Sequence, residues 1–110
     1  MKIQIQTPGR EFVVGTSSIT ITDSGTITLD DDHQITFLET DKSEYDVCKK
    51  EWGYYATPSI NGRLEHFNYM TCLVKNSAEK KYIMIVKTSK LEEFKTYLEI
   101  ENLVIETWFN

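Results

Sequence analysis

Residues 68–109, NYMTCLVKNSAEKKYIMIVKTSKLEEFKTYLEIENLVIETWF, decide the fold. Apolar and β-branched residues dominate 68–75 and 81–88, which predicts two strands joined by the polar segment 76–79. Within the first of these strands, residues 70, 72 and 74 lie on one face because side chains alternate between faces. This face is apolar, so we expect Cys72 to be buried and chemically inert.

A helix and a further strand follow this strand pair. The pattern Ser89-x-x-Glu92 is typical of a capping box at a helix N-terminus. Behind it, apolar residues at positions 91, 94, 97 and 98 recur at helical spacing, and residues 103–109 predict a final strand. The order strand, strand, helix, strand indicates one helix packed on an antiparallel or mixed sheet, and hence an α+β fold.

Residues 1–40 have the pattern of an antiparallel β-meander. Isoleucine and other apolar residues alternate with Lys, Gln, Ser and Thr, which predicts strands with one face on a core. Turn-forming residues separate these segments at Pro8-Gly9, Asp23-Ser24-Gly25 and Asp30-Asp31-Asp32. We expect each of these three groups to reverse the chain between neighbouring strands.

Between the meander and the C-terminal elements the pattern is less regular. Residues 41–52 predict a short helix, because Tyr45, Cys48 and Trp52 fall near one helical face, although an extended conformation also fits. Residues 53–66 lack a period and contain Gly, Pro and an Asn-Gly pair, which predicts a long loop. Long loops inside compact domains are often functional.

Length, composition and charge bound the class of protein. The chain has 110 residues and is 40% apolar, which favours one α+β domain over residues 1–110, with a meander portion (1–40) and an α+β portion (41–110). Its net charge is −5, divided as −6 over residues 1–47 and +1 over residues 48–110. This balance disfavours nucleic-acid and anionic-membrane binding. No long apolar run is present, so we expect no membrane contact and a cytoplasmic location.

The segment Trp52–Leu64, WGYYATPSINGRL, concentrates the side chains suited to binding. Aromatic rings stack on sugars, bases or guanidinium groups, arginine holds carboxylate or phosphate in a fork, and hydroxyls add hydrogen bonds. The alternative is that the aromatic rings anchor the loop and the arginine is solvated. The predicted ligand-binding residues are Trp52, Tyr54, Tyr55, Thr57, Ser59, Asn61 and Arg63.

This segment also resembles a string found in small uncharacterised bacterial domains, some of them at the ends of larger proteins linked to surface-polysaccharide or methyl-transfer functions. The similar stretch runs over residues 45–86, with Trp52-Gly53, Ala56–Ser59 and Asn61–Leu64 at its centre. The resemblance implies an accessory module and carries no activity with it.

Other chemistries have weaker patterns. Asp30-Asp31-Asp32-His33 lacks the spacing of a calcium loop, so we interpret it as a solvated turn and expect no metal site. The two cysteines favour reduced packing residues rather than a disulfide framework. Cys48, beside two lysines, could form a nucleophile–base pair with His66, which is the enzyme alternative. We expect no cofactor and no catalytic residue.

Three functional hypotheses follow from these patterns. The first is a non-enzymatic binding or accessory module that contacts a protein partner or a small polar ligand through Trp52–Leu64. The second is a small enzyme or enzyme subunit that uses Cys48 or His66, with Arg63 as an anion holder. The third is an acidic inhibitor or immunity-type protein, whose charge would attract a basic partner. Exposed strand edges also make a homodimer an open alternative.

Overall fold

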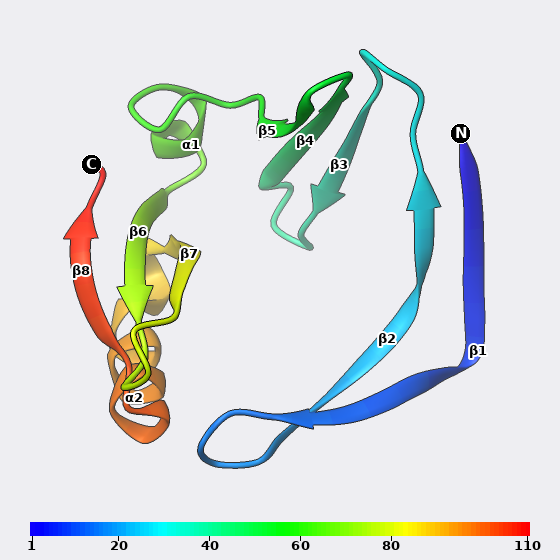
Figure 1. The fold of residues 1–110 in the computed structure, drawn as a ribbon. Helices are drawn as coiled ribbons and strands as arrows, with labels where there is room; N and C mark the ends of the chain where they lie inside the picture. The colour runs from blue at the N-terminus through cyan, green and yellow to red at the C-terminus, as the bar shows by residue number, and fades with distance from the viewer. The chain divides into compact units, whose positions relative to one another are not determined.

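The structure is a computed structural model that describes residues 1–110, and its architecture is α+β as the sequence predicts (Figure 1). Contacts divide the chain into two compact units, Met1–Thr57 and Pro58–Asn110, which we call the N-terminal unit and the C-terminal unit. None of the helices has the length and apolar character needed to cross a membrane.

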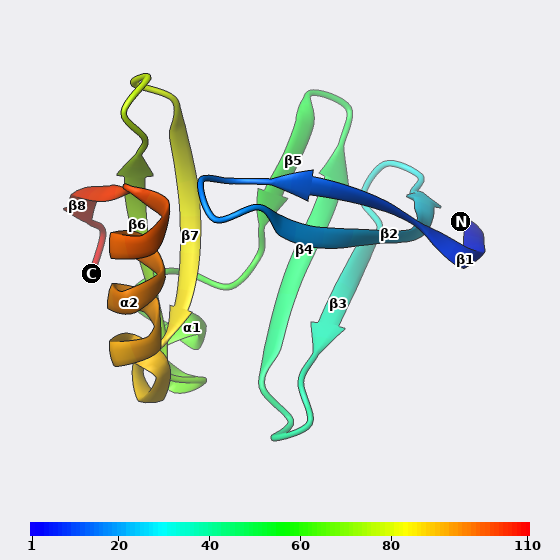
Figure 2. The same ribbon diagram turned by 90° about the horizontal axis from the view of Figure 1, so that it is seen from below.

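The C-terminal unit contains the predicted strand–strand–helix–strand order. Strand β6 (Tyr69–Lys75) pairs antiparallel with β7 (Lys81–Lys87) on one side and with β8 (Val104–Trp108) on the other. Helix α2 (Leu91–Glu101) connects β7 to β8 and lies along the sheet (Figure 2). These elements confirm the strands and the helix that the sequence predicts over residues 68–109.

The core of this unit forms between the middle strand and the helix. Cys72 and Val74 of β6 are fully buried and contact Leu98 of α2. Side chains that complete this core are half-buried; they are Met84, Phe94, Leu103, Ile105 and Trp108. The predicted burial of Cys72 is therefore confirmed, because the apolar face of β6 meets the apolar face of α2.

The start of α2 differs from the predicted capping box. A 3₁₀ turn, η1 (Thr88–Lys90), precedes the helix, Lys90 is the N-cap residue, and no side chain caps the first turn. Ser89 lies inside the 3₁₀ turn, so it lacks the extended backbone that lets a serine hydroxyl accept an amide of the first helical turn. At the other end, Asn102 adopts the left-handed conformation common after a helix (φ 55°, ψ 44°).

The N-terminal unit contains two antiparallel sheets. Strands β1 (Lys2–Val14) and β2 (Ile19–Thr28) form a long hairpin. Strands β3 (Gln34–Leu38), β4 (Glu44–Lys50) and β5 (Gly53–Ala56) form a three-stranded sheet with β4 in the middle. The predicted antiparallel strands are present, and β2 and β3 belong to different sheets.

Two of the three predicted turns are instead an irregularity within the hairpin. Pro8-Gly9 lies within β1 and Asp23-Ser24-Gly25 within β2, and the pairing register shifts between Ile5 and Arg10. Figure 1 shows both strands bending at this irregularity. A Cβ atom on Gly25 would lie 2.2 Å from the carbonyl oxygen of Gln4, so the glycine allows the close approach of the strands. The turn-forming residues therefore lie at the register shift between the two strands, and the chain reverses at residues 15–18.

The predicted helix at residues 41–52 is also wrong, because residues 44–50 form strand β4. The carboxylate of Asp41 accepts the amide of Ser43 (2.9 Å), which stabilises the turn before β4 rather than a helix start. Along β4, buried Asp46 accepts a short hydrogen bond from the hydroxyl of Thr36 on β3. Backbone pairing with strands on both sides outweighs the helical pattern of this short segment, since short helices are marginal by themselves.

We expect Leu98→Ala to lower the free energy of unfolding by about 3 kcal/mol, because the substitution leaves a cavity against Cys72 and Val74. Leu98 is 7% exposed, whereas Ile100 on the same helix is 54% exposed. Ile100→Ala is therefore the matched control and should cost much less. Urea unfolding followed by circular dichroism measures both changes, and equal losses would contradict the core described above.

Candidate functional site

The segment Trp52–Leu64 is more ordered than the predicted loop over 53–66. Residues 53–56 form β5, in which Tyr54 pairs with Lys49 and Tyr55 pairs with Cys48 of β4. Residues 57–62 are irregular, and residues 63–66 form the short helix α1 (Arg63–His66). Strand β5 has only four residues, too few to show an alternating pattern of apolar and polar side chains. Its pairing with β4 could therefore not be predicted from the sequence.

Three exposed aromatic side chains, which we call the aromatic cluster, lie on the hairpin formed by β4 and β5, and Tyr54 and Tyr55 occupy opposite faces of β5 because side chains alternate along a strand. Trp52 is 70% exposed, Tyr54 65% and Tyr55 43%. The rings of Trp52 and Tyr55 stack at a centroid distance of 6.0 Å and an angle of 26°. The ammonium of Lys49 lies 5.8 Å from the centroid of Tyr54, within cation–π range.

Charged pairs connect this hairpin to the turn before β3. Lys49 binds the carboxylate of Asp31 at 3.0 Å, and Lys50 binds that of Asp32 at 2.5 Å. The Asp32 amide donates to the Lys49 carbonyl (2.8 Å), so the backbone holds the same two segments together. Residues 31 and 32 form a turn as predicted, but β2 and β3 do not pair across it, and two of its carboxylates bind the lysines.

The pair between Asp32 and Lys50 shifts the titration of both groups. The hydrogen bond and the positive charge of Lys50 lower the pKa of Asp32 below its ordinary value of 3.8. The same contact raises the pKa of Lys50. Both groups are solvent-exposed, so the pair fixes the position of side chains at the edge of the aromatic cluster more than it stabilises the fold.

Thr57, a predicted ligand-binding residue, has a structural role at the end of β5. Its hydroxyl donates to the side-chain oxygen of Gln34 on β3 (2.9 Å). Its amide donates to the carbonyl oxygen of Asp46 on β4 (3.1 Å). Both contacts fasten the strand that carries Tyr54 and Tyr55.

The other three predicted residues, Ser59, Asn61 and Arg63, belong to the C-terminal unit. The carbonyl oxygen of Ser59 accepts the amides of Gly62 (3.3 Å) and Leu64 (3.1 Å), which turns the chain into α1. Asn61-Gly62 is therefore a helix entry and not a hairpin turn. Leu64 is buried, whereas the side chains of Ser59, Asn61 and Arg63 are exposed. The seven predicted residues thus divide between the two units, and among them only Trp52 and Tyr55 are in ring contact.

The two cysteines are separate from each other and from His66 in the contacts that they make. Both are free thiols and both are buried. The thiol of Cys48 donates to the carbonyl oxygen of Lys49 (3.5 Å), and burial raises the pKa of Cys72. Cys48 lies in the N-terminal unit and His66 in the C-terminal unit, where His66 packs edge-on against Phe67.

Four charged residues border the aromatic cluster and were not among the predicted site residues: Lys49, Lys50, Asp31 and Asp32. The sequence shows the two lysines and the acidic turn about 18 residues apart, but only the pairing of β3 with β4 brings them together. No group of three or more His, Cys, Asp or Glu side chains could hold a metal ion.

Comparison with known proteins assigns no family to this chain. No protein-family model, no curated protein and no solved structure matches the chain. The functional inference therefore depends on the exposed aromatic cluster, the ion pairs beside it and the strands that support it.

In the native protein we expect slow reaction of both cysteines with a thiol reagent at neutral pH, because neither sulfur is accessible. Labelling should become fast in guanidinium chloride, where the chain unfolds. Mass spectrometry of digested protein assigns each rate, with Cys48→Ser as the reference for Cys72. Rapid native labelling of Cys48 would contradict the described burial and favour the enzyme hypothesis.

Lys50→Met should raise the pKa of Asp32 toward its ordinary value, because the hydrogen bond and the positive charge are removed. The ion pair exists above the lowered pKa and is lost as pH falls through it. Lys49→Met is the matched control, since Lys49 binds Asp31 and not Asp32. NMR titration of the side-chain carboxyl carbons measures the shifts. An unchanged Asp32 pKa in Lys50→Met would show that the pair does not form.

Proposed function

We propose that this chain is a non-enzymatic binding module that contacts a protein partner through the aromatic cluster of Trp52, Tyr54 and Tyr55. One observation carries the proposal: three large aromatic side chains within four residues are 43–70% exposed on one hairpin. Exposing such side chains to water forgoes the stabilisation that burial would give. Exposed apolar side chains that pack together, as the rings of Trp52 and Tyr55 do, are characteristic of interaction sites.

The composition of the surface favours a protein as the partner. Tryptophan and tyrosine are enriched among the residues that dominate protein–protein binding energy, and polar or charged residues usually surround them. Here the ion pairs Lys49–Asp31 and Lys50–Asp32 supply the charged surroundings. An apolar side chain of a partner could cover the stacked rings of Trp52 and Tyr55 while those charges stay hydrated at the rim.

The support beneath the cluster is consistent with a surface that is ready to bind. Tyr54 and Tyr55 lie on β5, which pairs with the middle strand of its sheet. Thr57 fastens the end of β5 to Gln34 and to the backbone of Asp46. Side chains held on a paired strand lose less entropy on binding than side chains on a mobile loop, which increases affinity.

Charge favours a basic partner over an acidic one. The N-terminal unit contains ten acidic and five basic residues, a net charge of −5, whereas the C-terminal unit contains seven of each. An acidic unit attracts a basic partner and speeds its association. This charge is also the observation behind the second candidate, an acidic inhibitor or immunity-type protein acting in the cytoplasm. The resemblance over residues 45–86 supports an accessory role beside a larger bacterial protein.

Selection from a random peptide library displayed on phage tests the aromatic cluster. The wild-type protein should enrich peptides that share a basic and apolar motif. A double variant carrying Trp52→Ala and Tyr55→Ala should bind those peptides at least about tenfold more weakly. Tyr82→Ala, which removes a half-exposed tyrosine in the other unit, is the matched control.

Amide chemical shifts of the labelled protein then locate the bound peptide. Shifts centred on residues 49–56 would support the proposal, and shifts confined to other residues would refute it. A panel of oligosaccharides, nucleotide-sugars, S-adenosylmethionine, divalent metals and a short RNA is tested in the same way. Binding of one of these compounds at the cluster, without any peptide, would assign the site to a small ligand instead.

A further inference from the structure

We propose that the outer half of the β1–β2 hairpin, residues 10–23, is a self-association surface on which a second copy of this chain docks face to face. This surface is separate from the aromatic cluster, and the inference does not depend on the function proposed above. It follows from the register of the hairpin, the exposure of one of its faces and the position of two opposite charges on that face.

One face of the outer hairpin is mostly apolar. The strand register places three cross-strand pairs on it: Arg10 with Asp23, Phe12 with Ile21, and Val14 with Ile19. Arg10 binds Asp23 at 3.2 Å and lies 5.1 Å over the ring of Phe12, so these side chains do share a face. Glu11 and Val13 alternate with them and lie on the opposite face.

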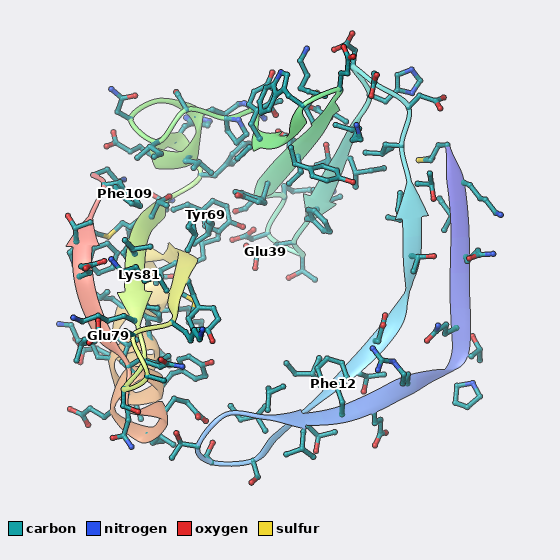
Figure 3. All side chains as sticks on the ribbon, viewed as in Figure 1. Phe12, Glu39, Tyr69, Glu79, Lys81 and Phe109 are labelled. Atoms are coloured by element: carbon teal, nitrogen blue, oxygen red, sulfur yellow. The ribbon has the colours of Figure 1, made fainter.

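This apolar face lacks a covering strand or helix within its own unit. The sheet contains only β1 and β2. Phe12 and Ile21 are 36% and 42% exposed, and Figure 3 shows the ring of Phe12 projecting from the inner side of the bend. A two-stranded hairpin with open faces is at best marginally stable in water, so covering this face would stabilise it.

The charges on the face fit a second copy. Residues 1–28 contain two basic and two acidic side chains, so the hairpin has no net charge. It therefore offers no net electrostatic attraction to a strongly charged partner. Arg10 and Asp23 lie on different strands at the same height. A two-fold axis parallel to the strands places β1 of one copy over β2 of the other. Arg10 of each copy then meets Asp23 of the other, and Phe12 meets Ile21.

The charges also favour this arrangement over the other two-fold arrangement. An axis perpendicular to the strands places β1 over β1 in reversed direction. Arg10 keeps its own Asp23, but across the axis it faces either a second Arg10 or the apolar side chain of Val14. It therefore meets a like charge or gains no oppositely charged partner from the second copy. The ion pair therefore selects one symmetric dimer, in which two hairpins stack as the two layers of a four-stranded sandwich.

Sedimentation velocity of the full-length protein over a wide concentration range is the first test. We expect a mass of two chains that falls toward one chain on dilution. Phe12→Asp should abolish the dimer, whereas Val13→Asp on the opposite face should leave it intact. A mass of one chain at every concentration, or equal effects of the two substitutions, would overturn the proposal.

Charge reversal separates docking from the ion pair within one hairpin. Arg10→Asp and Asp23→Arg should each be monomeric, because like charges then meet across the dimer axis. An equimolar mixture of the two variants should form a heterodimer, since every cross-chain contact becomes Asp against Arg. Loss of the internal pair alone predicts no such rescue. Glu11→Lys controls for a change of net charge, and a mixture that stays monomeric would refute the arrangement.

Discussion

Burial of the middle strand β6 against α2 is the interaction on which the C-terminal unit depends. Cys72 and Val74 have no exposed surface because β7 and β8 flank them and Leu98 covers them. The connections allow this packing. The 3₁₀ turn connects β7 to α2, and the left-handed Asn102 ends α2 before β8 begins. Hydrophobic burial thus determines both the pairing and the connections of this half of the chain.

The N-terminal unit is stabilised differently. Its buried residues include Ser43, Asp46 and Cys48, and its long hairpin exposes many apolar side chains. Strand pairing and polar contacts, such as Thr36 with Asp46, provide much of its organisation. A unit built in this way leaves apolar and aromatic groups exposed to solvent. Both surfaces that we propose for binding lie there for this reason.

These two surfaces differ in character. The aromatic cluster is supported by a paired strand and bordered by ion pairs with the turn before β3. The outer hairpin face is extended, mostly apolar and neutral, with its one ion pair lying across the two strands. The first surface suits a partner with a complementary side chain, and the second suits an identical surface. One dimer could therefore present two copies of the aromatic cluster.

The sequence alone determined the elements whose period is long and regular. Apolar spacing predicts the strands at 69–75 and 81–87, the helix at 91–101 and the burial of Cys72. It does so because an element with one face on the core and one in water has apolar side chains on the first face and polar side chains on the second. It also identified Trp52, Tyr54 and Tyr55 as unusual. Tertiary structure decided the rest. Residues 44–50 form a strand because they have partner strands on both sides, and Pro8-Gly9 lies in the register shift between Ile5 and Arg10. Whether a turn-forming residue reverses the chain or bends a paired strand depends on what lies opposite it, and that partner is distant in sequence.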